Sequence, residues 1–325
     1  MASLSENLTF PGSAGHALAA RLDLPEDGTP KAYALFAHCF TCSKDSVGAS
    51  RVSQALAARG IATLRFDFTG LGSSDGDFSN TDFSSNIGDL LAAIHYLRET
   101  GRAPSILIGH SLGGAAILAA AGQVPEARAV VTIAAPFDPA HVAHNFGDST
   151  AEIEAKGEAV VNLGGRPFTI RKQFLEDIAA QDQAARIAAL HKPLLIFHAP
   201  RDETVGIDNA EAIYKAAKHP KSFVSLDGAD HLLTKRADAT YVADVLAAWA
   251  SRFVDAEAER ERAPGPANGI VEVSETGKGK FSNLIRVGKH VLPADEPPSV
   301  EGGLDTGPGP YDYLLAALGA CTAMT

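Results

Sequence analysis

The sequence predicts an α/β protein built on a mostly parallel sheet with helices on both faces. Short apolar runs alternate with helix-like stretches over roughly the first three quarters of the chain, and this βαβα order is typical of a parallel sheet. Most of the apolar runs lack alternation, as expected of strands buried on both faces. A Gly-x-Ser-x-Gly motif at residues 109–113 lies between one such run and a helix-like stretch.

The expected elements follow one another in a regular order. Residues 8–10 and 17–24 are expected to form an antiparallel hairpin at the sheet edge. The expected strands of the main sheet are residues 32–37, 62–68, 105–108, 129–134, 194–198 and 222–226. The expected helices are residues 47–59, 83–99, 112–123, 209–217 and 240–253.

Two intervals interrupt this order. Residues 138–191 are helix-like pieces with a Gly-Gly turn, and an insertion of this length between two strands predicts a cap. Near Asp255 a charged run leads into the sequence APGPANG, which is typical of a linker. We therefore predict a first domain at residues 1–254, a linker at residues 255–268 and a further segment at residues 269–325.

Composition excludes several classes of partner. The 325 residues include 28 Lys and Arg against 39 Asp and Glu, so the net charge is −11 and we expect no nucleic-acid partner. No apolar run has the length of a bilayer span, so we expect no membrane partner. Met1–Phe10 carry no signal-peptide pattern, and the three cysteines are sparse. These features favour a cytoplasmic protein without a disulfide scaffold.

Ser111 is the candidate nucleophile. The apolar run before Gly109 and the Ala-rich helix after Gly113 provide the strand–turn–helix context in which a serine hydroxyl projects above the strand ends. The two glycines let strand and helix approach each other. The unpaired N–H groups at the start of the helix face a developing oxyanion. No Gly-Lys-Ser/Thr follows, so a phosphate-binding loop is excluded.

A general base is expected late in the chain, since the order in such sites is serine, acid, histidine. His231 follows the strand at residues 222–226 and is expected at the same sheet edge as Ser111. His219 precedes that strand and is expected at the opposite edge. The sequence therefore favours His231 as the base, with the adjacent Asp230 as a turn former.

Three carboxylates are candidates for the acid that orients this histidine. Asp202 comes where the strand at residues 194–198 stops, Glu203 is adjacent to it, and Asp138 follows the strand at residues 129–134. We favour Asp202, whose role would be to hold the imidazole tautomer and stabilise the imidazolium.

The loop after the strand at residues 32–37 is the candidate second half of an oxyanion hole. Acyl transfer needs two backbone donors aimed at one oxygen, and we assign them to Phe40 and Leu112. Cys39 and Cys42 in this loop form a C-x-x-C spacing that is found in redox and zinc sites. We interpret Cys39 as a small packing residue and Cys42 as a buried thiol, and we expect no metal and no cofactor.

The chain as a whole resembles the bifunctional α/β-hydrolase/OsmC family. Residues 1–254 resemble the hydrolase part, which implies the α/β-hydrolase fold. Residues 269–325 resemble the first part of an α+β OsmC domain, through runs at residues 290–297, 302–311 and 318–325. The resemblance implies that Cys321 matches the peroxide-reacting thiol of that domain. The later, resolving cysteine of the family has no counterpart in this sequence.

These observations together predict a serine hydrolase that cleaves a small-molecule carboxylic ester through an acyl-enzyme. Amide or thioester hydrolysis at the same triad is one alternative. A thiol-dependent peroxidase that uses Cys321 is another. The helix-like run at residues 311–318 has an apolar face without a partner in its own segment, so we also expect pairing of this segment in a homodimer.

Overall fold

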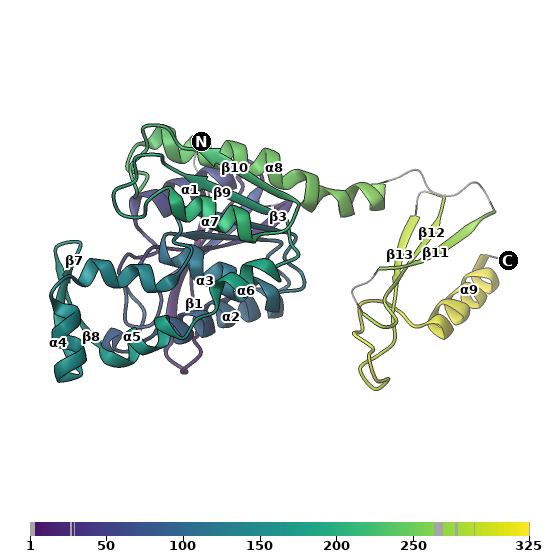
Figure 1. The fold of residues 1–325 in the computed structure, drawn as a ribbon. Coiled ribbons are helices and arrows are strands. Elements are labelled where there is room, and N and C mark those ends of the chain that lie inside the picture. The colour runs from purple at the N-terminus through teal and green to yellow at the C-terminus, as the bar shows by residue number, and fades with distance from the viewer. Residues whose placement is uncertain are drawn as a thin grey trace. The chain divides into compact units, whose positions relative to one another are not determined.

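An eight-stranded sheet forms the centre of the first of two compact units, residues 1–255 and 256–325 (Figure 1). The computed structural model describes residues 4–26, 28, 30–262, 269–276, 279–288 and 290–324. The strands of the sheet are β1 (Leu4–Pro11), β2 (Ala17–Leu24), β3 (Ala32–Ala37), β4 (Ile61–Phe66), β5 (Ile106–His110), β6 (Ala129–Ile133), β9 (Leu194–His198) and β10 (Lys221–Ser225).

The strand order is β1-β2-β4-β3-β5-β6-β9-β10. From β4 to β10 all neighbours are parallel, whereas β1, β2 and β4 pair antiparallel. The predicted mostly parallel architecture is confirmed, together with the edge hairpin. The predicted strand at residues 62–68 ends earlier, at Phe66.

Helices cover both faces of this sheet. They are α1 (Val47–Ala57), α2 (Phe83–Glu99), α3 (Leu112–Ala120), α6 (Gln183–Ala188), α7 (Asp208–Ala216) and α8 (Arg236–Arg262). Figure 1 shows α1 and α8 above the sheet and α2, α3 and α6 below it. Within β5, Ile106 and Ile108 pack with α1 and α8, whereas Leu107 packs with α2 and α3. Because both faces are buried, the strand is continuously apolar.

The interval between β6 and β9 forms the predicted insertion. It contains the 3₁₀ helix η3 (Pro139–Phe146), α4 (Ser149–Lys156), the hairpin β7 (Glu158–Leu163) with β8 (Arg166–Arg171), α5 (Lys172–Ala179) and α6. The hairpin differs from the expected helix-like pieces. Its signal is the alternation of exposed and buried residues along β7 and the turn Gly164-Gly165, where both φ angles are positive. Two shorter 3₁₀ helices, η1 (Phe78–Asn80) and η2 (Ala121–Gln123), lie elsewhere in this unit.

Residues 255–262 of the predicted linker continue α8 as helix. These residues are Asp, Ala, Glu and Arg, and Ala, Glu and Arg are strong helix formers. The first proline or glycine after residue 254 is Pro264. The second unit contains an antiparallel sheet of β11 (Val271–Glu275), β12 (Asn283–Val287) and β13 (His290–Ala294), and the helix α9 (Pro310–Met324).

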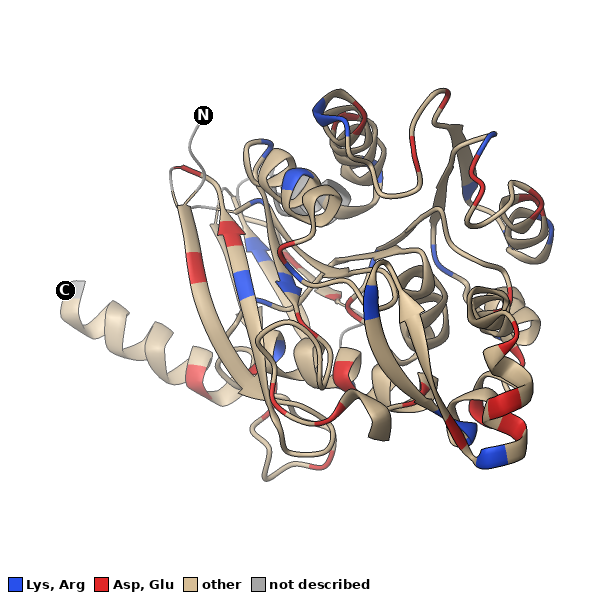
Figure 2. Ribbon diagram, turned by 90° about the vertical axis from the view of Figure 1, so that its left-hand side faces the viewer, with Lys and Arg blue, Asp and Glu red and all other residues tan. Residues whose placement is uncertain are grey.

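The distribution of charge and the length of the apolar helices both bear on possible partners. Figure 2 shows acidic and basic residues interspersed over the strands and outer helices. Within the part of the chain that the structure describes, no helix combines the length and apolarity of a membrane span.

Candidate active site

The strand order brings the loops after β3 and β5 to one point. These strands are adjacent and parallel, with Ala37 opposite Gly109. The chain leaves β3 toward β4 on one side and leaves β5 toward β6 on the other. The two loops therefore diverge at the carboxyl ends of the strands, where open parallel sheets bind their ligands.

Ser111 occupies a tight turn between β5 and α3. Its φ of 54° and ψ of −128° lie in a region that non-glycine residues rarely adopt. A Cβ at Gly109 would lie 2.5 Å from the Cα of Gly114, and a Cβ at Gly113 would lie 2.6 Å from the carbonyl oxygen of Ala37. Only glycine at these positions lets the strand, the helix and the loop after β3 approach so closely.

The structure brings Ser111, His231 and Asp202 into one hydrogen-bonded chain. The Ser111 Oγ lies 3.1 Å from the His231 Nε2, and the His231 Nδ1 lies 2.8 Å from an Asp202 Oδ2. The Asp202 side chain has no exposed area and the His231 side chain is 11% exposed. The carboxylate therefore favours the tautomer with a proton on Nδ1, which leaves Nε2 to accept the serine proton.

Backbone donors keep Asp202 ionised. Burial acts to raise the pKa of this carboxyl, but the hydrogen bonds from His231 and from the N–H groups of Val205 and Thr204 outweigh it, and the pKa is lowered. The Thr204 and Val205 nitrogens lie 2.9 and 3.0 Å from the Oδ1, so the other oxygen is left for His231. Asp202 is thus oriented by the turn that follows β9.

The other candidates from the sequence lie elsewhere. Glu203 is exposed, and Asp138 accepts a hydrogen bond from the Ala140 N–H at the start of η3. His219 precedes β10, at the amino end of the strands. Asp230 accepts hydrogen bonds from the Leu232 and Thr234 N–H groups, in agreement with its interpretation as a turn former.

The loop that carries His231 is held in place by contacts outside the Gly-x-Ser-x-Gly motif consensus. The His110 Nε2–H donates to the His231 carbonyl over 2.7 Å. Burial, and next the charge of His231, lower the pKa of His110 to about 3, so this ring is a neutral donor. On the other side, a Cβ at Gly48 in α1 would overlap the Leu232 carbonyl. Sequence reasoning missed His110, although it stands directly before the serine, at the unspecified position of the Gly-x-Ser-x-Gly motif.

Phe40 and Leu112 both line the cavity above Ser111. Leu112 is the first residue of α3, and an N–H at that position has no acceptor within its own helix. The Phe40 ring packs among Phe78, Phe146 and Phe174, with ring centroids 5.4–6.2 Å apart. This packing ties the loop after β3 to η1 and to the insertion.

The cavity has a volume of about 500 Å³ and a mixed lining. Ser111 and His231 lie in its wall, and the insertion contributes apolar Val142 and Leu163 as well as polar side chains. One of these, Arg166 in β8, donates a hydrogen bond to the Thr41 carbonyl and lies over the Phe168 ring. Residues from η3, β7 and β8 of the insertion thus form part of the wall of this cavity.

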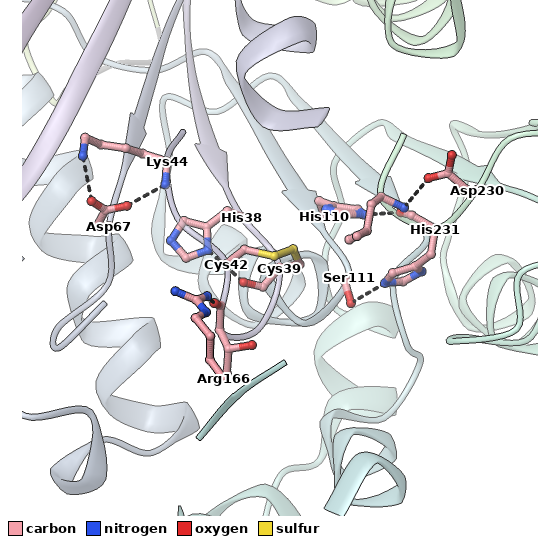
Figure 3. Close-up of a disulfide and its surroundings, with 12 residues drawn as sticks. His38, Cys39, Cys42, Lys44, Asp67, His110, Ser111, Arg166, Asp230 and His231 are labelled. Carbon is pink, nitrogen blue, oxygen red and sulfur yellow. Dashed lines mark hydrogen bonds and ion pairs between the residues drawn. A yellow bond between two sulfur atoms is a disulfide. The ribbon is translucent and has the colours of Figure 1, made fainter. Parts of the chain in front are cut away.

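The structure corrects our interpretation of Cys39 and Cys42. They form a disulfide, with the Cα atoms 5.3 Å apart, rather than a packing residue and a buried thiol (Figure 3). The turn between them brings the side chains together, since the Cys42 N–H donates to the Cys39 carbonyl over 3.1 Å. Both residues line the cavity that holds Ser111. The disulfide therefore lies inside the proposed oxyanion loop.

The buried ion pair between Lys44 and Asp67 supports the loop after β3. The Asp67 carboxylate accepts from the backbone N–H and the Nζ of Lys44 and from the Ser73 N–H. A Cβ at Gly72 would overlap that carboxylate, so the glycine-rich turn wraps around it. The nearby His38 Nδ1 lies 2.8 Å from the Cys39 carbonyl. The turn thus serves as a support of the loop after β3.

Cys321 lies on α9 in the second unit with an exposed side chain. The other two cysteines of the sequence are bonded to each other. A peroxidase role for Cys321 stays a prediction.

Comparisons with known proteins agree with the geometry of the first unit. Residues 34–267 match the model of the alpha/beta hydrolase family. The esterase domain of a Rhodothermus marinus protein is 52% identical in sequence, with a TM-score of 0.65, over 77% of this chain and 99% of that domain. The family match ends at residue 267, and the resemblance of residues 269–325 to an OsmC domain stays a prediction.

Two further relatives differ in what their names describe. The mitochondrial palmitoyl-protein thioesterase ABHD10 of Mus musculus is 28% identical over 218 residues, which are 63% of this chain and 70% of that protein. Est1E of Butyrivibrio proteoclasticus, solved with ferulic acid bound, is 21% identical with a TM-score of 0.63, over 76% of this chain and 99% of that one. The second likeness shows the fold alone.

Proposed function

Since the chain belongs to the alpha/beta hydrolase family, we propose that it is a serine hydrolase that cleaves carboxylic esters through an acyl-enzyme. The observation that carries the proposal is the hydrogen-bonded chain from Ser111 through His231 to Asp202, in which Ser111 and His231 line a cavity. A serine, a base within reach and an acid that orients the base are the requirements of nucleophilic acyl transfer.

The proposed reaction has two halves. The Ser111 Oγ attacks the ester carbonyl while the His231 Nε2 takes its proton, and Asp202 stabilises the imidazolium. The N–H groups of Phe40 and Leu112 bind the oxyanion of the tetrahedral intermediate. His231 then gives its proton to the leaving alcohol. Water, deprotonated by the same imidazole, releases the acid and restores Ser111.

The cavity supports a small-molecule substrate. A volume of about 500 Å³ lies within the usual range for pockets that bind small molecules. Phe40, Leu112 and Val142 offer apolar surface beside the serine, which suits an acyl chain. The polar groups of the insertion, Asn145 and Asn162 among them, face the same space and suit a substrate that also carries hydrogen-bonding groups.

Thioester hydrolysis at the same triad is the second candidate. The murine relative is named a palmitoyl-protein thioesterase, and a thioester carbonyl needs the same nucleophile and donors. A matched panel of an ester, a thioester and an amide with one acyl group separates the three chemistries by kcat/KM. We expect the ester to be cleaved fastest. A thioester preference would reassign the substrate class and leave the triad in place.

A fluorophosphonate probe tests the nucleophile directly. Mass spectrometry of the labelled protein should place the adduct on the peptide that contains Ser111. Ser111→Ala should remove both labelling and hydrolysis of short-chain p-nitrophenyl esters. Ser105→Ala, at the other end of β5, is the matched control and should keep both. Activity that survives in Ser111→Ala would contradict the proposal.

A further inference from the structure

The Cys39–Cys42 disulfide encloses the residue to which we assign an oxyanion donor. It closes a short ring of which Phe40 and Thr41 are the two inner residues. Figure 3 shows the disulfide between the His38–Lys44–Asp67 group and the Ser111–His231 pair. Both cysteines line the cavity of about 500 Å³ that holds Ser111. Any change at the sulfurs therefore acts on the backbone beside the nucleophile.

The backbone inside the ring is held in an unfavourable conformation. Thr41 is β-branched and has a φ of 58°, in the left-handed region that such residues avoid. Such a conformation is unfavourable for a β-branched residue, so it persists only where its surroundings impose it. The ring imposes it from one side, and Arg166 of the insertion, which donates to the Thr41 carbonyl, imposes it from the other. Opening the ring removes one of these two constraints.

The two cysteines differ in exposure. Both line the cavity, but Cys39 is only 4% exposed, whereas Cys42 is half-buried. A small thiol that enters through the substrate cavity therefore reaches the Cys42 Sγ first. The buried Cys39 is the leaving thiolate.

On the premise that Ser111 hydrolyses esters, we propose that Cys39–Cys42 is a thiol-exchange site through which small dithiols switch hydrolysis off. One thiolate of the dithiol attacks the Cys42 Sγ, the bond between the two protein sulfurs breaks, and Cys39 leaves as a thiolate that takes up a proton. The second thiol of the reagent attacks the mixed disulfide and frees Cys42. The protein disulfide is reduced by two electrons, and the dithiol becomes a cyclic disulfide.

Reduction lets the Phe40–Thr41 segment relax, and the Phe40 N–H leaves the position of the oxyanion. Removal of one oxyanion donor costs about 10²–10³ in kcat. Because the ring packing of Phe40 retains part of the geometry, we expect a loss of about tenfold to a hundredfold in kcat. The switch therefore makes the oxidised protein the active one.

The experiment is a redox titration of the full chain with two parallel readouts. The protein is equilibrated with reduced and oxidised dithiothreitol at graded ratios. Ester hydrolysis and the mass shift of Cys39 and Cys42 after maleimide labelling are then measured on the same samples. We expect kcat to fall as the two thiols appear and to return on reoxidation. Cys321→Ser is the control and should show the same response.

Variants separate the role of the sulfurs from that of the fold. Cys42→Ser and Cys39→Ser should have the low kcat of the reduced protein and should no longer respond to dithiothreitol, while circular dichroism shows a native fold. A covalent fluorophosphonate adduct in the cavity should slow the appearance of the Cys42 thiol, because it blocks the path of the reagent.

Two results would overturn the proposal. One is the appearance of both thiols with unchanged kcat. The other is a disulfide that resists excess dithiothreitol in the folded protein. Absence of ester hydrolysis and of probe labelling in the oxidised protein would instead refute the proposed function. The mass shift would still report whether the disulfide had been reduced.

Discussion

Replacement of Asp202 by Asn tests the catalytic assignment most sharply. The Asn Oδ1 can still accept the N–H groups of Thr204 and Val205, which lie 2.9 and 3.0 Å from that oxygen in the native side chain. The amide nitrogen then stands where Oδ2 stood, 2.8 Å from the His231 Nδ1. Because an amide nitrogen only donates, it favours the imidazole tautomer with the proton on Nε2.

That tautomer presents a proton, and no lone pair, to the Ser111 Oγ. Loss of the base in this way lowers kcat by about 10⁴ in serine hydrolases, which corresponds to about 5.4 kcal/mol of transition-state stabilisation. We expect this loss in kcat for p-nitrophenyl butyrate, with KM little changed. The fold should persist, since the substituted side chain keeps its shape and two of its hydrogen bonds.

Matched variants identify the acid. Asp138→Asn and Glu203→Gln remove the two other candidate carboxylates and should each leave kcat within a factor of about three. Stopped assays over long incubation times can follow a residual rate of the expected size. An Asp202→Asn enzyme with kcat within tenfold of the native value, or a large loss in Asp138→Asn, would refute the reasoning.

Three further predictions follow from the same contacts. Activity should fall toward acid pH in a single step, because the general base must be neutral to accept the serine proton. The lowered pKa values keep Asp202 charged and keep His38, His110 and His198 neutral, so a profile of kcat/KM against pH with a slope of two would contradict this. Gly113→Ala should lower the melting temperature, since the added Cβ would lie 2.6 Å from the Ala37 carbonyl oxygen and overpacking costs about 1–3 kcal/mol. Gly122→Ala is the control and should leave the melting temperature unchanged, because no atom lies within 4 Å of the added Cβ. We also propose that the chain forms a homodimer through the second unit, where Tyr311 and Leu314 on α9 are 80% and 65% exposed. Light scattering should then show a dimer for the full chain and a monomer for a chain cut after Arg262.

The local patterns of the sequence predicted much of the site. Ser111 and His231 each follow a recognisable strand and stand at its carboxyl end, and parallel strands present those ends at one sheet edge. The proposed triad was predicted in this way from chain order. The sequence favoured Asp202 over Glu203 and Asp138. Neighbouring residues in a turn differ in the direction of their side chains, and the structure shows that Asp202, not Glu203, contacts His231.

The disulfide shows the limit of spacing as a signal. C-x-x-C is compatible with a thiol pair, a metal site or a bridge, and only the turn that sets the Cα atoms 5.3 Å apart selects the bridge. The hairpin β7–β8 was within reach of the sequence, since alternation around Gly164-Gly165 is a hairpin pattern.

By itself the sequence determined the mostly parallel α/β sheet, the tight turn at Ser111 and the position of His231 at the same sheet edge, because hydrophobic periodicity and glycine placement act over a few residues. The tertiary structure decided what holds these groups: His110 against the His231 carbonyl, Arg166 against Thr41, and Gly48 against the loop of Leu232. Each of these contacts joins residues more than a hundred positions apart. No local pattern encodes such a pair, since the two residues meet only where the packing of sheet, helices and insertion brings their segments together.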